Sequence, residues 1–279
     1  MSLSPETLQL ASMLDDQDND VGLNVLAQLL NREDEVEELS RILQEYPDPL
    51  VRKRIHTLQN AFVMRRRRRQ ISAMLKEAVP SDIIGTLISL HLLWFDKDNP
   101  ADIRRDVEKF MESAAAFPMT SLDDLEIFMR QNRFLPENET TIRPESYCLG
   151  TVIFHRLGAT SALMALGLAL LNDEKKYQAV RVLGQFAIRD ERGRVLLGHG
   201  SWRQESLPEN FPVEYWPVGK LLRYIAVTLL SCAVNSDSYR YVMSITRVLT
   251  GNEEKNVFDN FPYPYCAGEE MLGDGKQLF

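Results

Sequence analysis

The residues best suited to covalent chemistry lie in the middle of the chain. Cys148 and Thr160 are possible nucleophiles, and His155 and His199 are possible bases. A thiol or hydroxyl becomes a nucleophile when an imidazole within about 3 Å removes its proton, and such a pair would catalyse acyl transfer or hydrolysis. The chain has no glycine-rich phosphate loop, no paired metal-ligand histidines and no G-x-S-x-G elbow, so no other enzyme class is indicated.

One predicted helix and two predicted strands would position these residues. Apolar and small residues from Leu149 to Leu171 predict a single long helix. Residues 180–188 and 195–197 are rich in β-branched and apolar residues, which predicts two strands joined by a turn over residues 190–193. The N-terminal end of a helix and two antiparallel strands can bring a nucleophile and a base together. On one continuous helix, Cys148 and Thr160 would be roughly 18 Å apart along the axis.

Short motifs mark this central block. They are Ser146-Tyr147, Arg156-x-Gly158, an Ala/Leu-rich helix and Gly184-x-Phe186-x-Ile188-Arg189. With these motifs, the segment from about residue 70 to about residue 250 resembles the bacterial transglutaminase-like proteins of the SirB type, which are similar to papain-like transglutaminases. The resemblance implies an α+β fold that is mostly helical, with a small antiparallel sheet packed on a central helix.

The resemblance also implies where the catalytic Cys-His-Asp positions of the superfamily fall. The cysteine position falls on Thr160, the histidine position on Gln185 and the acid position near Gly198, beside His199. Glutamine cannot accept a proton at neutral pH and threonine has no adjacent base, so these positions cannot perform thiol chemistry. We therefore expect no catalytic residue, and a degenerate groove between these four positions that holds a peptide or a small polar ligand.

Three parts are expected along the chain. Residues 1–69 alternate short helical segments with Asp-rich or Pro-containing turns and look like a HEAT-type helical extension. Residues 70–204 would form the transglutaminase-like core, and residues 205–279 a helical hairpin followed by an extended tail.

Charge is unevenly distributed in the first part. Residues 1–50 hold twelve acidic and two basic residues, whereas residues 51–76 hold nine basic residues and no acidic one. The run Arg65–Arg69 would suit an anionic partner such as RNA, lipid or an acidic protein. We favour packing of this basic helix beside the acidic one, because the net charge of −8 is unlike that of a general nucleic-acid binder.

The sequence indicates no membrane segment, metal or cofactor. The longest apolar run, residues 157–171, is shorter than the roughly 18 residues that span a bilayer, and the N-terminus does not resemble a signal peptide. Three cysteines that are far apart predict neither a disulfide framework nor a zinc site. We expect a cytoplasmic protein without a cofactor, in which His91 is a satisfied core residue because it lies within an apolar run.

Three classes of function stay open. The favoured one is a catalytically inactive binding or regulatory module whose partner is an unknown peptide, protein or small molecule. The second is a residual hydrolase or acyltransferase that uses His199 with Thr160 or Cys148. The third is a structural scaffold for protein–protein interaction, in which the aromatic side chains of residues 261–265 fill the groove.

Overall fold

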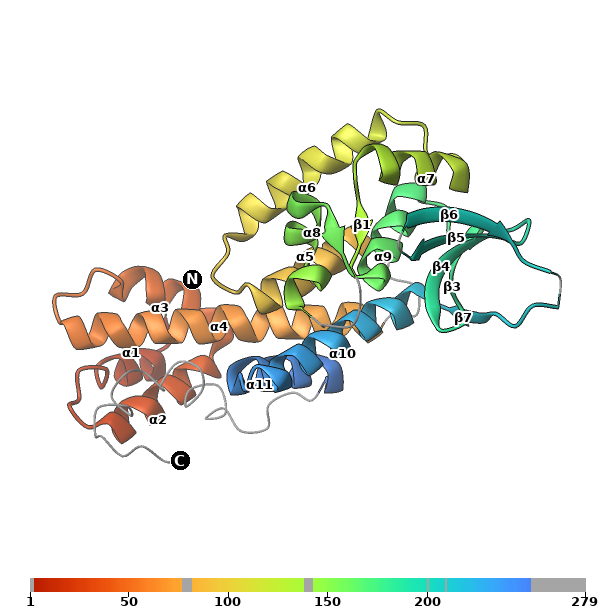
Figure 1. The fold of residues 1–279 in the computed structure, drawn as a ribbon. Helices are drawn as coiled ribbons and strands as arrows, with labels where there is room; N and C mark the ends of the chain where they lie inside the picture. Colours follow the sequence, from red (N-terminus) through yellow and green to blue (C-terminus); the bar gives the residue numbers. More distant parts are fainter. Residues whose placement is uncertain (1–2, 77–81, 138–142, 200, 209, 252–279) are drawn as a thin grey trace. The chain divides into compact units, whose positions relative to one another are not determined.

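The chain forms two compact units. The computed structural model describes residues 3–76, 82–137, 143–199, 201–208 and 210–251 (Figure 1). Among the described residues, those up to Arg69 belong to unit 1, and unit 2 comprises Gln70–Gly251. Most of these residues are helical, and unit 2 also contains a five-stranded antiparallel sheet. The predicted fold class, mostly helical α+β, is confirmed.

Unit 1 is built from helices with a core of their own. They are α1 (Pro5–Ala11), α2 (Asn19–Leu30), α3 (Glu33–Leu43) and the first part of α4 (Pro49–Lys76). Ser4 and Asp18 cap α1 and α2, because their side chains accept hydrogen bonds from the N–H groups of Thr7 at 3.3 Å and Asp20 at 2.8 Å. Buried aliphatic side chains of α2, α3 and α4 fill the interior, among them Leu26, Leu30, Leu39, Ile55 and Leu58.

A buried arginine organises the connection between α1 and α2. The Arg54 guanidinium donates hydrogen bonds to the carbonyl oxygens of Leu14 at 3.0 Å, Asp16 at 2.6 Å and Asp18 at 3.3 Å. Gly22 gives this guanidinium room, since a Cβ at that position would lie 2.3 Å from the arginine Cζ. Arg54 therefore satisfies backbone acceptors of the loop that would otherwise lack donors inside the unit.

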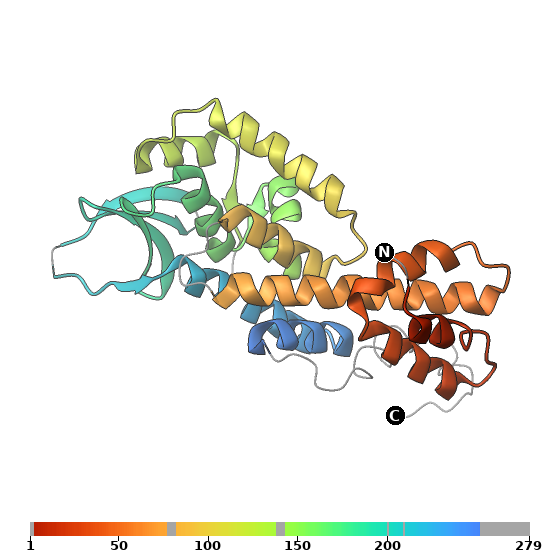
Figure 2. The ribbon, with the colours of Figure 1, turned by 180° about the vertical axis from the view of Figure 1, so that it is seen from behind.

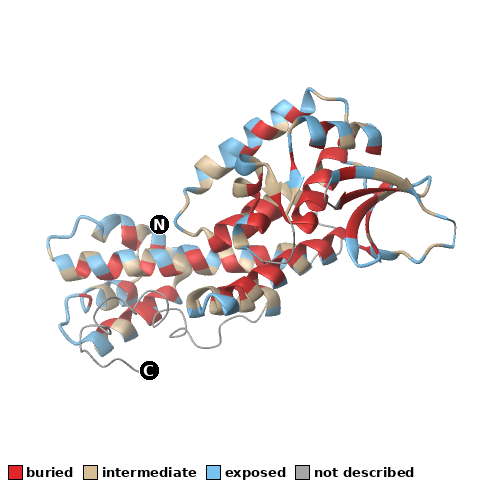
Figure 3. Cartoon of the chain, in the orientation of Figure 1, coloured by how far each residue is buried: buried red, intermediate tan, exposed pale blue. Residues whose placement is uncertain are grey.

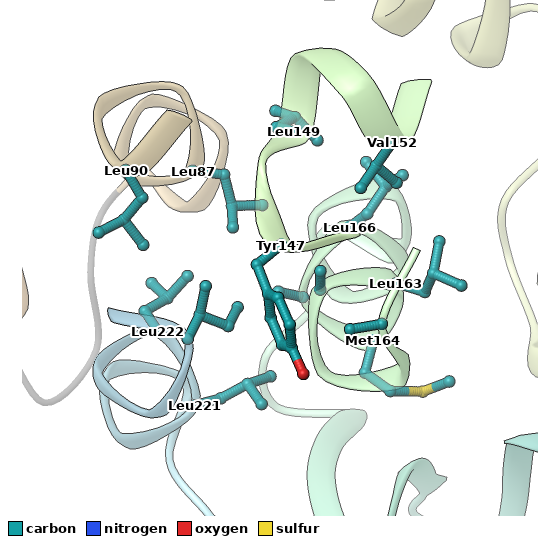
Figure 4. Packing of buried hydrophobic residues seen from close by; sticks show 14 of the residues in the cluster. Leu87, Leu90, Tyr147, Leu149, Val152, Leu163, Met164, Leu166, Leu221 and Leu222 are labelled. Atoms are coloured by element: carbon teal, nitrogen blue, oxygen red, sulfur yellow. The ribbon is translucent and has the colours of Figure 1, made fainter. Parts of the chain in front are cut away.

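The helices of unit 2 pack around a central helix, α9. Their bounds are α5 (Ile83–Trp94), α6 (Pro100–Ala115), α7 (Leu122–Gln131), the 3₁₀ helix η1 (Pro144–Tyr147), α8 (Leu149–His155), α9 (Thr160–Leu171), α10 (Val218–Asn235) and α11 (Tyr239–Thr250). The side chains of Asp82, Asn99 and Ser121 cap α5, α6 and α7. Figure 4 shows leucines of α5, α9 and α10 meeting around the buried ring of Tyr147.

The prediction of one continuous helix over residues 149–171 is wrong. Arg156 adopts a left-handed conformation with φ of 58° and ends α8, and α9 begins only at Thr160. Between them, β2 (Leu157–Gly158) pairs in parallel with β1 (Leu135–Pro136). This pairing connects residues far apart in the chain, so the local apolar pattern does not reveal it.

The sheet has the strand order β6-β5-β4-β3-β7. The strands are β3 (Tyr177–Val182), β4 (Gln185–Asp190), β5 (Arg194–His199), β6 (Ser201–Ser206) and β7 (Glu214–Trp216). The single predicted strand over residues 180–188 is therefore two strands. They are joined at Leu183 and Gly184, whose φ values of 50° and 83° are those of a tight hairpin turn.

Both faces of the sheet are buried (Figure 3). One face carries Phe186 and Ile188 and packs into the main core with α9. The opposite face carries a smaller apolar cluster that includes Val180, Ala187 and Val195, with partly buried side chains of residues 207–213 packed against it. On the inner strands β3 and β4, only Gln178 and Gln185 are exposed among the described side chains.

Among the described helices, α10 alone is long and apolar enough to cross a bilayer. More than half of its most apolar window is buried inside the structure, at 56%. Its buried side chains, including Leu221, Leu222 and Ile225, belong to the main core of unit 2. This is the environment of a core helix, and it is compatible with a soluble protein.

Candidate functional site

The N-terminus of α9 holds the expected nucleophile position. Thr160 is the first residue of this helix and is buried, and the preceding Ala159 provides no side-chain cap. The next residue, Ser161, is fully buried, and its hydroxyl has no hydrogen-bond partner. An acyl-transfer nucleophile must be reachable by substrate and must contact a base. The Ser161 hydroxyl does not meet the first of these requirements, and Thr160 offers little surface, since it is 8% exposed.

The sheet separates the other expected site positions. An ideal Cβ on Gly198 would lie 2.9 Å from Met164 Cε, so this part of β5 faces α9. On β4, Phe186 belongs to the core on the α9 side and Ala187 to the cluster on the opposite face. Because side chains alternate along a strand, the exposed Gln185 shares the face of Ala187. The structure therefore does not bring Gln185 together with Thr160 and Gly198.

The fourth position, His199, ends β5, where it lies opposite Ser201. Its side chain is outside the described part of the structure, so its pairing with Thr160 or Cys148 stays a prediction. The aromatic residues 261–265, expected to fill the groove in a scaffold protein, also lie outside the described residues.

Cys148 is placed where its thiol is least reactive. The residue precedes the first turn of α8 and is 0% exposed. Burial raises the pKa of the Cys148 thiol well above its ordinary value, and nearby Glu145 adds to the increase. His155 lies exposed at the far end of the same helix. A protonated, enclosed thiol is a poor nucleophile, so Cys148 has the character of a core residue.

We expect native Cys148 and Cys232 to resist alkylation by iodoacetamide at pH 7.5. Burial also raises the pKa of Cys232 to about 11, so both thiols stay protonated and covered. Mass spectrometry of tryptic peptides would detect both modifications only after denaturation. Rapid alkylation of Cys148 in the native protein would contradict this assignment and favour the residual enzyme.

His91 is a core residue, as predicted, but only one of its ring nitrogens is satisfied. The residue is 2% exposed, and Nε2 lies 3.0 Å from Asp98 Oδ2, whereas Nδ1 has no partner. Gly150 of α8 lies against the ring, since a Cβ there would be 2.8 Å from His91 Cε1. Burial lowers the pKa of His91, and the hydrogen bond that its Nε2–H donates to Asp98 only partly opposes this. The imidazole is therefore neutral in the folded protein at neutral pH.

Three arginines of the basic run on α4 pair with two carboxylates within unit 1. Arg65 and Arg69 lie 3.2 and 2.7 Å from the carboxylate of Glu33 on α3, and Arg66 lies 3.4 Å from Glu37. The predicted packing of the basic helix beside the acidic one is confirmed for these three arginines. The pairs reduce the positive charge that this run could offer to an anionic partner.

An open cleft lies between α7 and β6 in unit 2. It has a volume of about 590 Å³ and is lined by every residue of β6 (Ser201–Ser206), by Asp123, Glu126 and Arg130 of α7, and by Arg194. Helix α7 and β6 lie side by side in both views (Figure 1, Figure 2). Residues from both faces of β6 line the cleft, because side chains alternate along a strand. The cleft therefore follows the unpaired edge of the sheet.

Polar contacts hold the wall of this cleft in place. Gln204 of β6 donates hydrogen bonds to Asp123 at 2.8 Å and to Glu126 at 3.0 Å. Arg194 pairs with Asp123 at 2.9 Å and with Asp190 at 2.8 Å. The Arg194 guanidinium and then the Gln204 amide lower the pKa of Asp123, so its carboxylate stays ionised at neutral pH. The cleft is thus a preformed polar channel with balanced charge.

Sequence reasoning missed this cleft. Its residues are polar side chains scattered over α7 and β6, and no motif marks them. The signal that could have found it is the composition of β6, SWRQES, which reads as a polar edge strand once the hairpin with β5 is assigned.

Among the described residues, no group of three or more His, Cys, Asp or Glu side chains is arranged to hold a metal ion. No family model, no curated protein and no solved structure matches this chain. By its fold and its candidate site, the chain is thus a mostly helical α+β protein with an open cleft along an edge strand. What it does must be inferred from that cleft.

Proposed function

We propose that this chain is a non-catalytic binding module that takes an extended peptide segment of a partner protein as an additional strand on β6. The observation that carries the proposal is the cleft lined by all six residues of the edge strand and by one face of α7. An edge strand presents unpaired N–H and C=O groups, which is the surface that strand addition uses. The burial of Thr160 and Cys148 supports a role without catalysis.

The remaining parts of this proposal rest on the sequence. The motifs around Arg156-x-Gly158 and Gly184-x-Phe186 support a degenerate relative of the SirB-type transglutaminase-like proteins, and the helices of unit 1 support a HEAT-like extension. The burial of α10 and the two free, buried cysteines Cys148 and Cys232 support a cytoplasmic location. Finding the protein in a membrane fraction after expression at low level would contradict that location.

The matched substitutions Arg130→Trp and Arg105→Trp test the peptide site. Both arginines lie on exposed helix surfaces and pair with a carboxylate one turn away, at 3.2 Å for Glu126 and 2.8 Å for Asp102. Only Arg130 lines the cleft, so its indole would fill the space for a peptide. For peptides selected from a random linear library, we expect Arg130→Trp to weaken binding at least about tenfold and Arg105→Trp to leave it unchanged.

Amide hydrogen exchange locates the bound peptide. Strand addition should protect every second amide of β6, because alternate N–H groups point to the open edge. The amides of β7, the opposite edge strand, serve as the internal control. If no peptide is enriched, or if enriched peptides protect β7 instead, the proposed function fails.

A further inference from the structure

A second groove, in unit 1, runs between α1 and α2. It has a volume of about 440 Å³, and Leu10, Met13, Val21 and Val25 give it an apolar lining. Val25 is buried in the core of the unit, and Leu10 and Val21 pack against that core. Met13 is 40% exposed, so its flexible side chain is available to a bound group. The groove thus presents an apolar strip that rests on a packed interior.

The lining residues of α2 recur with helical spacing. Val21, Asn24, Val25 and Gln28 share one face of α2, and Arg32 follows the end of this helix as the residue before α3. From Val21 to Gln28 they span seven residue steps, which is about 10.5 Å, or two helical turns. A groove of this length between two helices fits the apolar face of a third helix with side chains at i, i+3 or i+4, and i+7.

The two ends of the groove differ in charge. At one end Glu6 and Arg32 form an ion pair at 2.6 Å, so the net charge of this end is close to zero. At the other end, next to Met13 and Val21, the α1–α2 connection carries the exposed aspartates Asp15, Asp16 and Asp18, and the first turn of α2 adds Asp20. This end repels anionic surfaces and attracts cationic side chains.

We propose that the α1–α2 groove binds an amphipathic helix of a partner protein, with lysine or arginine residues at the end that lies against the aspartate-bearing connection. The apolar strip supplies the binding free energy, and the difference in charge between the two ends sets the direction of the bound helix. The site is independent of the β6 cleft, because all its lining residues belong to unit 1.

The test uses a fluorescent model peptide with leucines at i, i+3, i+4 and i+7 and lysines at one end. Its binding to the full chain is measured by anisotropy. The matched variants are Met13→Lys, in the groove just after α1, and Leu8→Lys, on α1 but outside the groove. Both side chains are exposed, at 40% and 54%, so both variants keep the core and add the same charge. We expect Met13→Lys to weaken binding at least about tenfold and Leu8→Lys less than about twofold.

Two further peptides test the partner's chemistry. A scrambled peptide of the same composition should not bind, because it has no continuous apolar face. Replacing the terminal lysines by glutamates should weaken binding, most strongly at low salt. Equal binding by both protein variants, or equal binding of ordered and scrambled peptides, would overturn the proposal.

Discussion

Replacing Arg54 by methionine should destabilise the α1–α2 region by about 3 kcal/mol, the largest effect we expect in unit 1. Methionine keeps most of the apolar stem but removes the donors to the carbonyl oxygens of Leu14, Asp16 and Asp18. The hydrogen bond to Leu14 is buried, so its acceptor would be left without water or protein partners. Hydrogen exchange of α2 amides, followed by mass spectrometry, should accelerate more than about a hundredfold.

Arg52 provides the matched control for this substitution. It lies on the same helix and also donates to two backbone carbonyls, those of Tyr46 at 2.7 Å and Pro47 at 3.0 Å, but these contacts are exposed. We expect Arg52→Met to cost less than about 1 kcal/mol, because water replaces the lost donors. Equal effects at Arg52 and Arg54 would show that the buried hydrogen bonds are not what stabilises the loop.

Gly22 tests the same contact from the opposite side. In a helix, alanine is ordinarily favoured over glycine by roughly 1 kcal/mol. Here the added methyl group would meet the Arg54 guanidinium, which can move away only by losing its hydrogen bonds to the loop. Gly22→Ala should therefore destabilise the wild-type chain yet stabilise Arg54→Met. The effect of Gly22→Ala on the free energy of unfolding should thus have opposite signs in the wild-type chain and in Arg54→Met.

The helices were predictable because their signals are local. The caps at Ser4 and Asp18 and the apolar spacing of α2 are contained in a few consecutive residues. Arg54 was not predictable, because its partners lie 36 to 40 residues earlier in the chain and are backbone atoms. The pairing of β1 with β2, which interrupts the expected central helix, depends on contacts of the same long-range kind.

The candidate site also depends on long-range contacts that local sequence patterns do not reveal. A resemblance of motifs places Thr160, Gln185 and Gly198 at corresponding positions, but it does not give the face of the sheet on which each lies. One additional turn, at Leu183 and Gly184, starts a new strand at Gln185, and the alternation along that strand then directs Gln185 away from α9. The edge-strand cleft, by contrast, needs the complete strand order before it can be recognised.

Lowering the pH from 7.5 to 5.5 should reduce the stability of unit 2 through His91. Burial lowers the pKa of His91 in the folded state, so the unfolded chain, with an ordinary pKa near 6.5, binds the proton more readily. Stability is then fully present above pH 6.5 and is lost as the pH falls toward the lower folded pKa, by up to about 1.4 kcal/mol per pH unit. Carboxylates with lowered pKa, such as Asp123, titrate below this window.

Urea unfolding at pH 7.5, 6.5 and 5.5 measures this loss, and tryptophan fluorescence reports unit 2 alone because all three tryptophans, Trp94, Trp202 and Trp216, lie in it. His91→Gln keeps an amide donor for Asp98 but cannot be protonated, so its stability should be nearly constant over the window. His155→Gln, at an exposed position of α8, should retain the wild-type slope. If His91→Gln retains that slope and His155→Gln loses it, the buried imidazole is not the group that titrates.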